Sequence, residues 1–244
     1  MNIVIIGATG GIGKCLSLEL SENNSLFLGS RNSDNISELI NSEDIGNSVS
    51  GSTVDVTSFN QIENFLNQAN DYLGSIDTII NCAGSLILKP AHLTSEEELE
   101  KTFKVNVFSC LGLLKYGFKF MRKNGGSFLF FSSAASKVGL KNHETISSAK
   151  GAISSMVVSA ASTYARYNIR VNAIAPGLVD TPLTESIINN KLSLDYSLNL
   201  HGLKRIGKPE NFTPIVKSLI DVKSDWITGQ TISVDGGLSN IKSM

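Results

Sequence analysis

The chain has 244 residues, of which 41% are hydrophobic and 18% are charged, and its formal net charge at pH 7 is −1. This composition is typical of a globular protein, and the near-neutral charge provides no field that would attract nucleic acid or an anionic membrane. No apolar run approaches the ~20 residues that span a bilayer, and the N-terminus lacks the basic region of a signal peptide. We therefore expect a cytoplasmic protein with one domain over residues 1–244.

Strand-like and helix-like segments alternate along the whole chain. The expected strands are Asn2–Gly7, Ser25–Ser30, Gly51–Val56, Ile76–Asn81, Phe128–Ser132, Ile169–Ala175 and Thr231–Val234. The expected helices are Gly11–Glu22, Ser58–Tyr72, Ser95–Met121, Ser147–Tyr167 and Pro209–Val222. Short strands that are apolar on both faces and alternate with amphipathic helices indicate a parallel sheet covered on both sides. Right-handed crossovers then predict an α/β, Rossmann-like, doubly wound sheet of about seven strands.

Two polar stretches and the cysteines complete this survey. Asn41–Ser50 is expected to be a loop, and Asp180–Gly207 is expected to be irregular and to cover a substrate. Cys15, Cys82 and Cys110 are widely spaced and form no C-x-x-C pair, which argues against a disulfide framework or a zinc site. We expect no bound metal.

A glycine-rich turn directly follows the first expected strand. Gly7 permits a tight turn, Gly11 permits a close approach of the backbone to a diphosphate, and Gly13 permits close packing of the next helix. The first N–H groups of that helix and its dipole favour an anion. The residues expected to contact a dinucleotide here are Gly7, Thr9, Gly11, Ile12 and Gly13.

The end of the second expected strand indicates which dinucleotide is bound. NAD-binding proteins usually place an acid there for the ribose 2′-hydroxyl, whereas this chain has Ser30 followed by Arg31. A hydroxyl and a cation suit a 2′-phosphate, so we expect NADP as the cofactor rather than NAD. The alternative is that Arg31 is an ordinary solvated surface residue.

Further short motifs follow the glycine-rich turn in a fixed order. They are Asp55-Val56, Asn81-Cys82-Ala83-Gly84, Asn106, Ser133, Lys150, Pro176-Gly177 before Thr181, Trp226-Ile227-Thr228-Gly229-Gln230 and Val234-Asp235-Gly236-Gly237. In this order the motifs resemble the short-chain dehydrogenase/reductase family, and the resemblance covers essentially the whole chain. It implies a small-molecule substrate and a homotetramer or homodimer built through the helices near Ser95–Met121 and Ser147–Tyr167.

The resemblance also implies roles for the matching residues. Asp55 and Val56 would flank the adenine, and Asn81, Ala83 and Gly84 would lie under the middle of the cofactor. The nicotinamide carboxamide would be held by Pro176, Gly177, Val179 and Thr181. Lys150 would bind the nicotinamide ribose and Ser133 the substrate oxygen, while Asn106 would kink its helix and anchor a water on a proton path.

One position departs from the family pattern. The family places a tyrosine four residues before the lysine, and this chain has Ile146 there, although the spacing from Ser133 fits. Isoleucine carries no proton for an alkoxide, and loss of a positioned acid usually costs ~10²–10⁴ in rate.

Other groups are candidates to supply the proton. His143 lies seven residues before Lys150 and returns near the same helix face, so it is the first candidate. Tyr196 and His201 lie in the expected covering segment and are weaker candidates, as are Glu144 and Ser147. Tyr164 and Tyr167 are too far along the helix.

Two classes of function remain open on this basis. One is an NADP-dependent oxidoreductase for a carbonyl or alcohol with non-standard proton delivery through His143, Ser133, Lys150 and Asn106. The other is a nucleotide-binding sensor or structural subunit without turnover, which Ile146 supports. A lyase or isomerase on the same scaffold is a third possibility.

Overall fold

The protein is built around a single sheet of seven parallel strands. The computed structural model describes residues 1–241, and the sheet order is β3-β2-β1-β4-β5-β6-β7. The strands are β1 (Asn2–Ile6), β2 (Ser25–Ser30), β3 (Val49–Thr53), β4 (Thr78–Asn81), β5 (Gly126–Phe131), β6 (Ile169–Pro176) and β7 (Thr231–Val234). The order reverses direction between β1 and β4, which creates a crevice at the carboxyl ends of these strands. The doubly wound α/β fold predicted from the sequence is confirmed.

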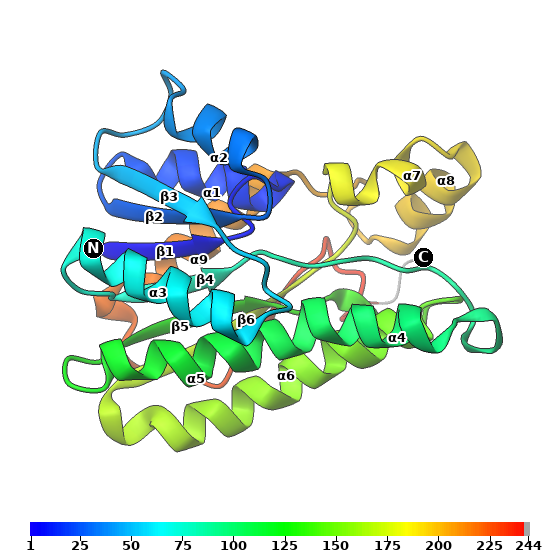
Figure 1. Cartoon of the computed structure of the whole chain (residues 1–244). Helices are drawn as coiled ribbons and strands as arrows, with labels where there is room; N and C mark the ends of the chain where they lie inside the picture. The colour runs from blue at the N-terminus through cyan, green and yellow to red at the C-terminus, as the bar shows by residue number, and fades with distance from the viewer. Residues whose placement is uncertain (242–244) are drawn as a thin grey trace.

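Helices cover both faces of the sheet. One layer contains α3 (Phe59–Leu73), α4 (Glu96–Phe103), α5 (Ser109–Met121) and α6 (Glu144–Tyr164), and the other contains α1 (Gly11–Ser21), α2 (Ser33–Ile40) and α9 (Thr213–Ile220) (Figure 1). Two apolar clusters fill the spaces between the sheet and these layers. The middle strands are therefore buried on both faces, which explains their continuous apolar sequence.

Two short helices project beyond the carboxyl end of the sheet. They are α7 (Glu185–Ile188) and α8 (Lys191–Leu200), and Figure 1 shows them as a separate yellow lobe above that end. The prediction that Asp180–Gly207 is irregular is therefore wrong in part. Neither helix has a fully buried residue, so the segment lacks the regular apolar stripe by which a helix is recognised in a sequence.

Other predicted boundaries also need correction. Helix α2 was not predicted, because only Ile36 and Leu39 of its eight residues are buried. Strand β3 starts at Val49 rather than at Gly51, since Val49 pairs with Leu26 on β2. Helix α6 starts at Glu144 rather than at Ser147, which places His143 at its N-cap.

The long expected helix Ser95–Met121 is interrupted in its middle. A π-helical turn at Lys104–Phe108 joins α4 to α5, and the predicted helix Pro209–Val222 begins with a 3₁₀ turn at Pro209–Phe212 before α9. Single π-turns inside α-helices frequently mark functional positions. Among the described residues, no helix combines the length and the apolar character needed to cross a membrane.

Candidate active site

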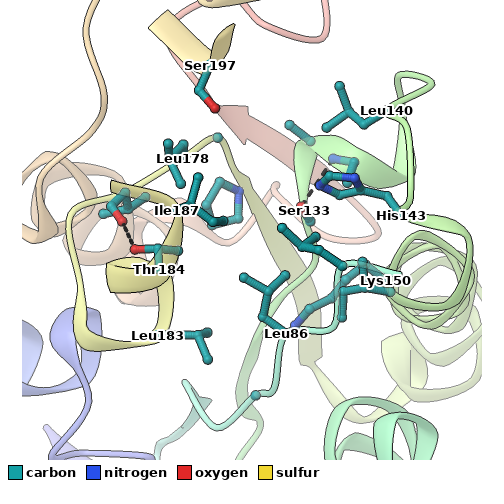
Figure 2. A pocket seen from close by; sticks show the side chains of 18 of the residues that line it. Leu86, Ser133, Leu140, His143, Lys150, Leu178, Leu183, Thr184, Ile187 and Ser197 are labelled. Atoms are coloured by element: carbon teal, nitrogen blue, oxygen red, sulfur yellow. Dashed lines mark hydrogen bonds between the residues drawn. The ribbon is translucent and has the colours of Figure 1, made fainter. Parts of the chain in front are cut away.

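A pocket of about 420 Å³ opens at the carboxyl ends of β4, β5 and β6. Its walls come from the segments that follow these strands, from the start of α6 and from the α7–α8 lobe (Figure 2). The pocket lies where ligands bind in open α/β sheets. Most of its lining is apolar, including Leu86, Leu140, Leu178 and Ile187.

One wall of the pocket carries the chemistry-bearing residues predicted from the sequence. Ser133, His143, Ile146 and Lys150 all line the pocket, and Ser133, His143 and Lys150 lie on the same side of it in Figure 2. Ile146 and Lys150 share one face of α6 because they are four residues apart. Ile146 is only 2% exposed and contributes no polar atom to this wall. The structure therefore brings these four side chains together, as the sequence predicted.

Lys150 is held at the base of this wall. Its Nζ donates a hydrogen bond to the carbonyl of Phe131, the last residue of β5, at 2.9 Å. Burial lowers the pKa of Lys150 to about 8, an effect that the thiols of Cys110 and Cys82 oppose. The pKa of the Lys150 ammonium is therefore close to neutral pH, the range in which a group exchanges protons most effectively.

The lowered pKa of Lys150 makes the stability of the cofactor-free protein depend on pH. The ordinary value of 10.5 applies to the unfolded chain, and the folded chain has a value of about 8. As the pH rises between these values, the folded chain loses its proton first, so the cost of burying the charge disappears. We expect the wild type to gain about 2–3 kcal/mol of stability relative to Lys150→Met across this interval. Denaturant titrations at both ends of the interval test this, and parallel stability curves for the two proteins would contradict it.

Asn106 lies in the π-helical turn and is 1% exposed. Its Nδ2 donates to the Thr102 carbonyl at 2.9 Å and to Ser85 Oγ at 2.9 Å, and its Oδ1 accepts from the Ser85 N–H at 3.3 Å. A Cβ atom on Gly84 would lie 3.2 Å from Asn106 Oδ1 and 3.6 Å from Lys150 Nζ, so Gly84 separates these two polar atoms. The side chain thus fixes the segment after β4. Its place on a proton path stays a prediction.

The glycine-rich turn has the geometry that a diphosphate requires. Gly7 has φ +74°, and a Cβ on Gly13 would lie 2.1 Å from the Gly7 carbonyl, so both positions need glycine. No side chain caps the N-terminus of α1, because its N-cap is Gly10, so its first N–H groups have no side-chain acceptor from the N-cap residue. A Cβ on Gly11 would lie 2.4 Å from Thr181 Cγ2, which places Thr181 directly against the turn. These residues fit a dinucleotide.

The residues beside this turn fit a 2′-phosphate. Thr9 Oγ1 and Ser30 Oγ lie 2.8 Å apart, and Arg31 follows on the exposed surface at the end of β2. A hydroxyl pair and a guanidinium therefore occupy the position where an NAD-binding protein carries an acid.

Three predicted cofactor residues have their side chains engaged elsewhere. The Asp55 carboxylate accepts hydrogen bonds from the N–H and hydroxyl of Thr57 at 2.9 and 2.8 Å. The side chain of Val56 is 4% exposed and packs in the core. Asn81 is buried, and its Oδ1 accepts from the Ala83 N–H at 3.1 Å, so it holds the turn after β4 rather than facing the pocket. Contacts from their main chains to a cofactor stay a prediction.

Seven further predicted cofactor residues line the pocket. Ile12, Ala83 and Gly84 line the side nearest to α1 and β4, and Pro176, Gly177, Val179 and Thr181 line the side below the lobe. Sequence reasoning missed the lining residues Ser85, Leu86 and Leu88 and those at 140–142. Their only sequence signal is their position after the ends of β4 and β5.

The comparison with known proteins identifies the family. The family model described as enoyl-(acyl carrier protein) reductase matches residues 7–239. A tropinone reductase homologue of Arabidopsis thaliana is 31% identical over 240 residues, which cover 97% of this chain and 91% of that protein. The chain belongs to the short-chain dehydrogenase/reductase family. The 3-oxoacyl-[acyl-carrier-protein] reductase FabG of Thermotoga maritima is 30% identical over 240 residues, covering 96% of this chain and 96% of that protein.

Solved structures of short-chain dehydrogenases/reductases have the same fold. ElxO with NADP bound has a TM-score of 0.89 and 27% identity, and the match covers 97% of this chain and 98% of that one. A second ElxO structure, with one tyrosine replaced by phenylalanine and NADPH bound, gives the same values.

The other candidate proton donors of this short-chain dehydrogenase/reductase are less suitable than His143. Ser147 Oγ donates to the Ala135 carbonyl at 2.7 Å, and Glu144 is exposed at the start of α6. Tyr196 lines the pocket from α8 but is 54% exposed. Tyr164 and Tyr167 pack against Phe118 at the other end of α6, which agrees with their rejection from the sequence.

His201 was a candidate donor, and its hydrogen bonds argue against that role. Its imidazole is 3% exposed, and both ring nitrogens are bonded to the main chain. His143 is therefore the candidate that the geometry favours.

Proposed function

We propose that this chain is an NADPH-dependent oxidoreductase that acts on the carbonyl or alcohol group of a largely apolar small molecule, with His143 as the proton donor in place of a tyrosine. The observation that carries the proposal is the arrangement of Ser133, His143 and Lys150 on one pocket wall around the buried, apolar Ile146. We further propose that the protein is a cytoplasmic homodimer or homotetramer. The exposed apolar side chains of α5 and α6, such as Leu111 and Val158, support the oligomer.

The cofactor site supports NADPH as the reductant. The turn at Gly7–Gly13 and the uncapped start of α1 would hold the diphosphate, and Ser30 and Arg31 would hold the 2′-phosphate. When bound, NADPH supplies the hydride. The presence of NADP or NADPH in the two ElxO structures agrees with this choice.

His143 is oriented by its own loop. Its Nδ1 lies 2.6 Å from the Lys141 carbonyl, and because a carbonyl can only accept, Nδ1 carries a hydrogen in this geometry. The half-buried ring lines the pocket, so Nε2 is the nitrogen that takes up and releases a proton there. In this proposal the Lys141 carbonyl stabilises the imidazolium, and Ser133 Oγ donates a hydrogen bond to the substrate oxygen.

The pocket lining indicates the substrate class. Leu178, Val179, Leu183 and Ile187 line the pocket with apolar side chains. Among the described residues that line the pocket there is no carboxylate, which disfavours a cationic substrate. An uncharged or anionic carbonyl compound with an apolar body fits this lining.

Substitution of His143 tests the proposed proton donor. His143→Gln keeps a polar side chain of similar size but cannot deliver a proton, so kcat for carbonyl reduction is expected to fall ~10²-fold or more. His92→Gln, on the surface between β4 and α4, is the matched control and is expected to leave kcat unchanged. The rate is read from the absorbance of the reduced nicotinamide over a panel of apolar ketones and aldehydes.

The buried Ile146 also supports the second candidate function, a nucleotide-binding sensor. Tight binding of NADPH without oxidation by any member of the panel would establish that function and overturn the oxidoreductase. Equal rates for His143→Gln and the wild type would be consistent with an oxidoreductase but would show that His143 is not its proton donor.

A further inference from the structure

His201 is a buried imidazole between the α7–α8 lobe and the end of β6. It directly follows α8, and its side chain is 3% exposed. The ring also lies near the turn after β7, because a Cβ on Gly236 would be 3.6 Å from His201 Cδ2. The imidazole therefore contacts three segments that are distant in the sequence.

The two hydrogen bonds of His201 require one protonation state. The main-chain N–H of Leu178 donates to Nε2 at 3.2 Å, and Nδ1 lies 2.7 Å from the Ser197 carbonyl. An N–H can only donate and a carbonyl can only accept, so Nε2 has a free lone pair and Nδ1 carries the hydrogen. The imidazole is therefore neutral in this structure, and a second proton on Nε2 would face another donor.

The ring also packs tightly on the segment that forms the floor of the pocket. A Cβ on Gly177 would lie 2.6 Å from His201 Nε2, so the ring occupies the space that any larger residue would fill. Pro176, Gly177 and Leu178 line the pocket, and so do Tyr196, Ser197 and Leu200 of α8. The bonds of His201 thus join the floor of the pocket to the helix that covers it.

Two charged residues, Asp235 and Arg205, line a small cavity together with His201. Asp235, in the turn after β7, is 6% exposed, and its carboxylate accepts hydrogen bonds from the N–H groups of Gly237 and Ser239 at 3.0 and 2.9 Å. The other residues around the ring, Ser197 of α8 and Gly177 and Leu178 directly after β6, are uncharged. Lys204 and Arg205, which are three and four residues after His201 in the sequence, are exposed.

We propose that His201 is a positioning residue that holds α8 over the pocket through its neutral imidazole, and that protonation of Nε2 releases α8. A proton added to Nε2 on acidification converts an acceptor for the Leu178 N–H into a second donor. The lobe then loses its hydrogen bond to the floor of the pocket. The part of this inference that concerns substrate affinity rests on the proposed function, whereas the part that concerns the mobility of α8 does not.

Hydrogen exchange of the cofactor-free wild type tests the release directly. After correction for the intrinsic effect of pH on exchange, the amides of α8 are expected to exchange about tenfold faster near pH 5 than near pH 8 relative to those of α3. This measurement needs no substrate and no turnover. Unchanged relative exchange of α8 over this range would overturn the proposal, even if the protein proved to be an active reductase.

Two substitutions separate the bonds of His201. In His201→Gln the amide oxygen can take the place of Nε2 as acceptor, and this side chain does not titrate. In His201→Asn the shorter amide can keep the bond to Ser197 but leaves the Leu178 N–H without a partner. We expect the exchange of α8 in His201→Gln to stay slow and independent of pH, and His201→Asn near pH 8 to match the wild type near pH 5.

Kinetics provide a second readout. With an active substrate, His201→Asn is expected to raise KM about tenfold with kcat within about threefold, and His201→Gln to restore KM. Thermal unfolding of both variants reports any general loss of stability. Equal exchange and equal KM for His201→Asn and the wild type, or a pH response of His201→Gln as large as that of the wild type, would refute the role of the Leu178 bond.

Discussion

Tyrosine in place of Ile146 is expected to restore, by at least about 10²-fold, the carbonyl reduction that His143→Gln removes. Position 146 lies on the face of α6 that lines the pocket, one turn before Lys150. A phenol there would have the Lys150 ammonium as its neighbour, which favours the phenolate and makes the hydroxyl a better acid. Because the His143→Gln variant is expected to lack only a proton donor, one added hydroxyl should restore its activity.

The measurement compares single and double variants under identical conditions. His143→Gln, Ile146→Tyr and the double variant are assayed for NADPH oxidation with the substrate on which the wild type turns over. Ile146→Phe in the same background is the matched control, because it adds the ring without the hydroxyl and should give no recovery. Equal rates for the tyrosine and phenylalanine variants would show that proton supply does not limit this site.

The second large effect is expected at the cofactor. Arg31→Glu is expected to raise the Kd for NADPH about 10²-fold and to leave the Kd for NADH within about threefold. The substitution removes a cation from the exposed end of β2, beside the Thr9–Ser30 hydroxyl pair, and puts a carboxylate where the 2′-phosphate would lie. NADH lacks that phosphate, so it does not meet the added repulsion.

Calorimetric titration with both nucleotides measures these constants. Lys123→Glu, which makes the same charge change on the exposed surface after α5, is the control for the general field of the protein and should alter neither constant. A parallel loss of NADH affinity in Arg31→Glu would place the 2′-phosphate elsewhere and assign Arg31 a structural role.

The site residues that the sequence predicted best are those whose function depends on local geometry. Gly7 and Gly13 are required by a turn and by a close backbone contact within one β-strand–helix unit. Ile146 and Lys150 face the same pocket because helical spacing alone puts them on one face. Such features need no knowledge of distant segments.

Residues whose role depends on contacts between distant segments were less predictable. His201 was a weaker candidate for the proton donor, but its ring is held between Leu178, 23 residues earlier, and Ser197. Asn81 was expected under the cofactor, yet its side chain turns inward to Ser109 and the Ala83 N–H. The periodicity of the sequence does not predict these hydrogen-bond partners of His201 and Asn81.

The amino-acid sequence by itself determined the parallel sheet, the glycine-rich turn after its first strand and the placing of Ile146 and Lys150 on one helix face, because these follow from side-chain chemistry and from the short repeats of strands and helices. Only the tertiary structure decided where α7 and α8 lie, and that His201 is bonded to the main chain through both ring nitrogens whereas His143 is bonded through Nδ1. Those outcomes depend on hydrogen bonds and packing between segments that meet only when the sheet is assembled.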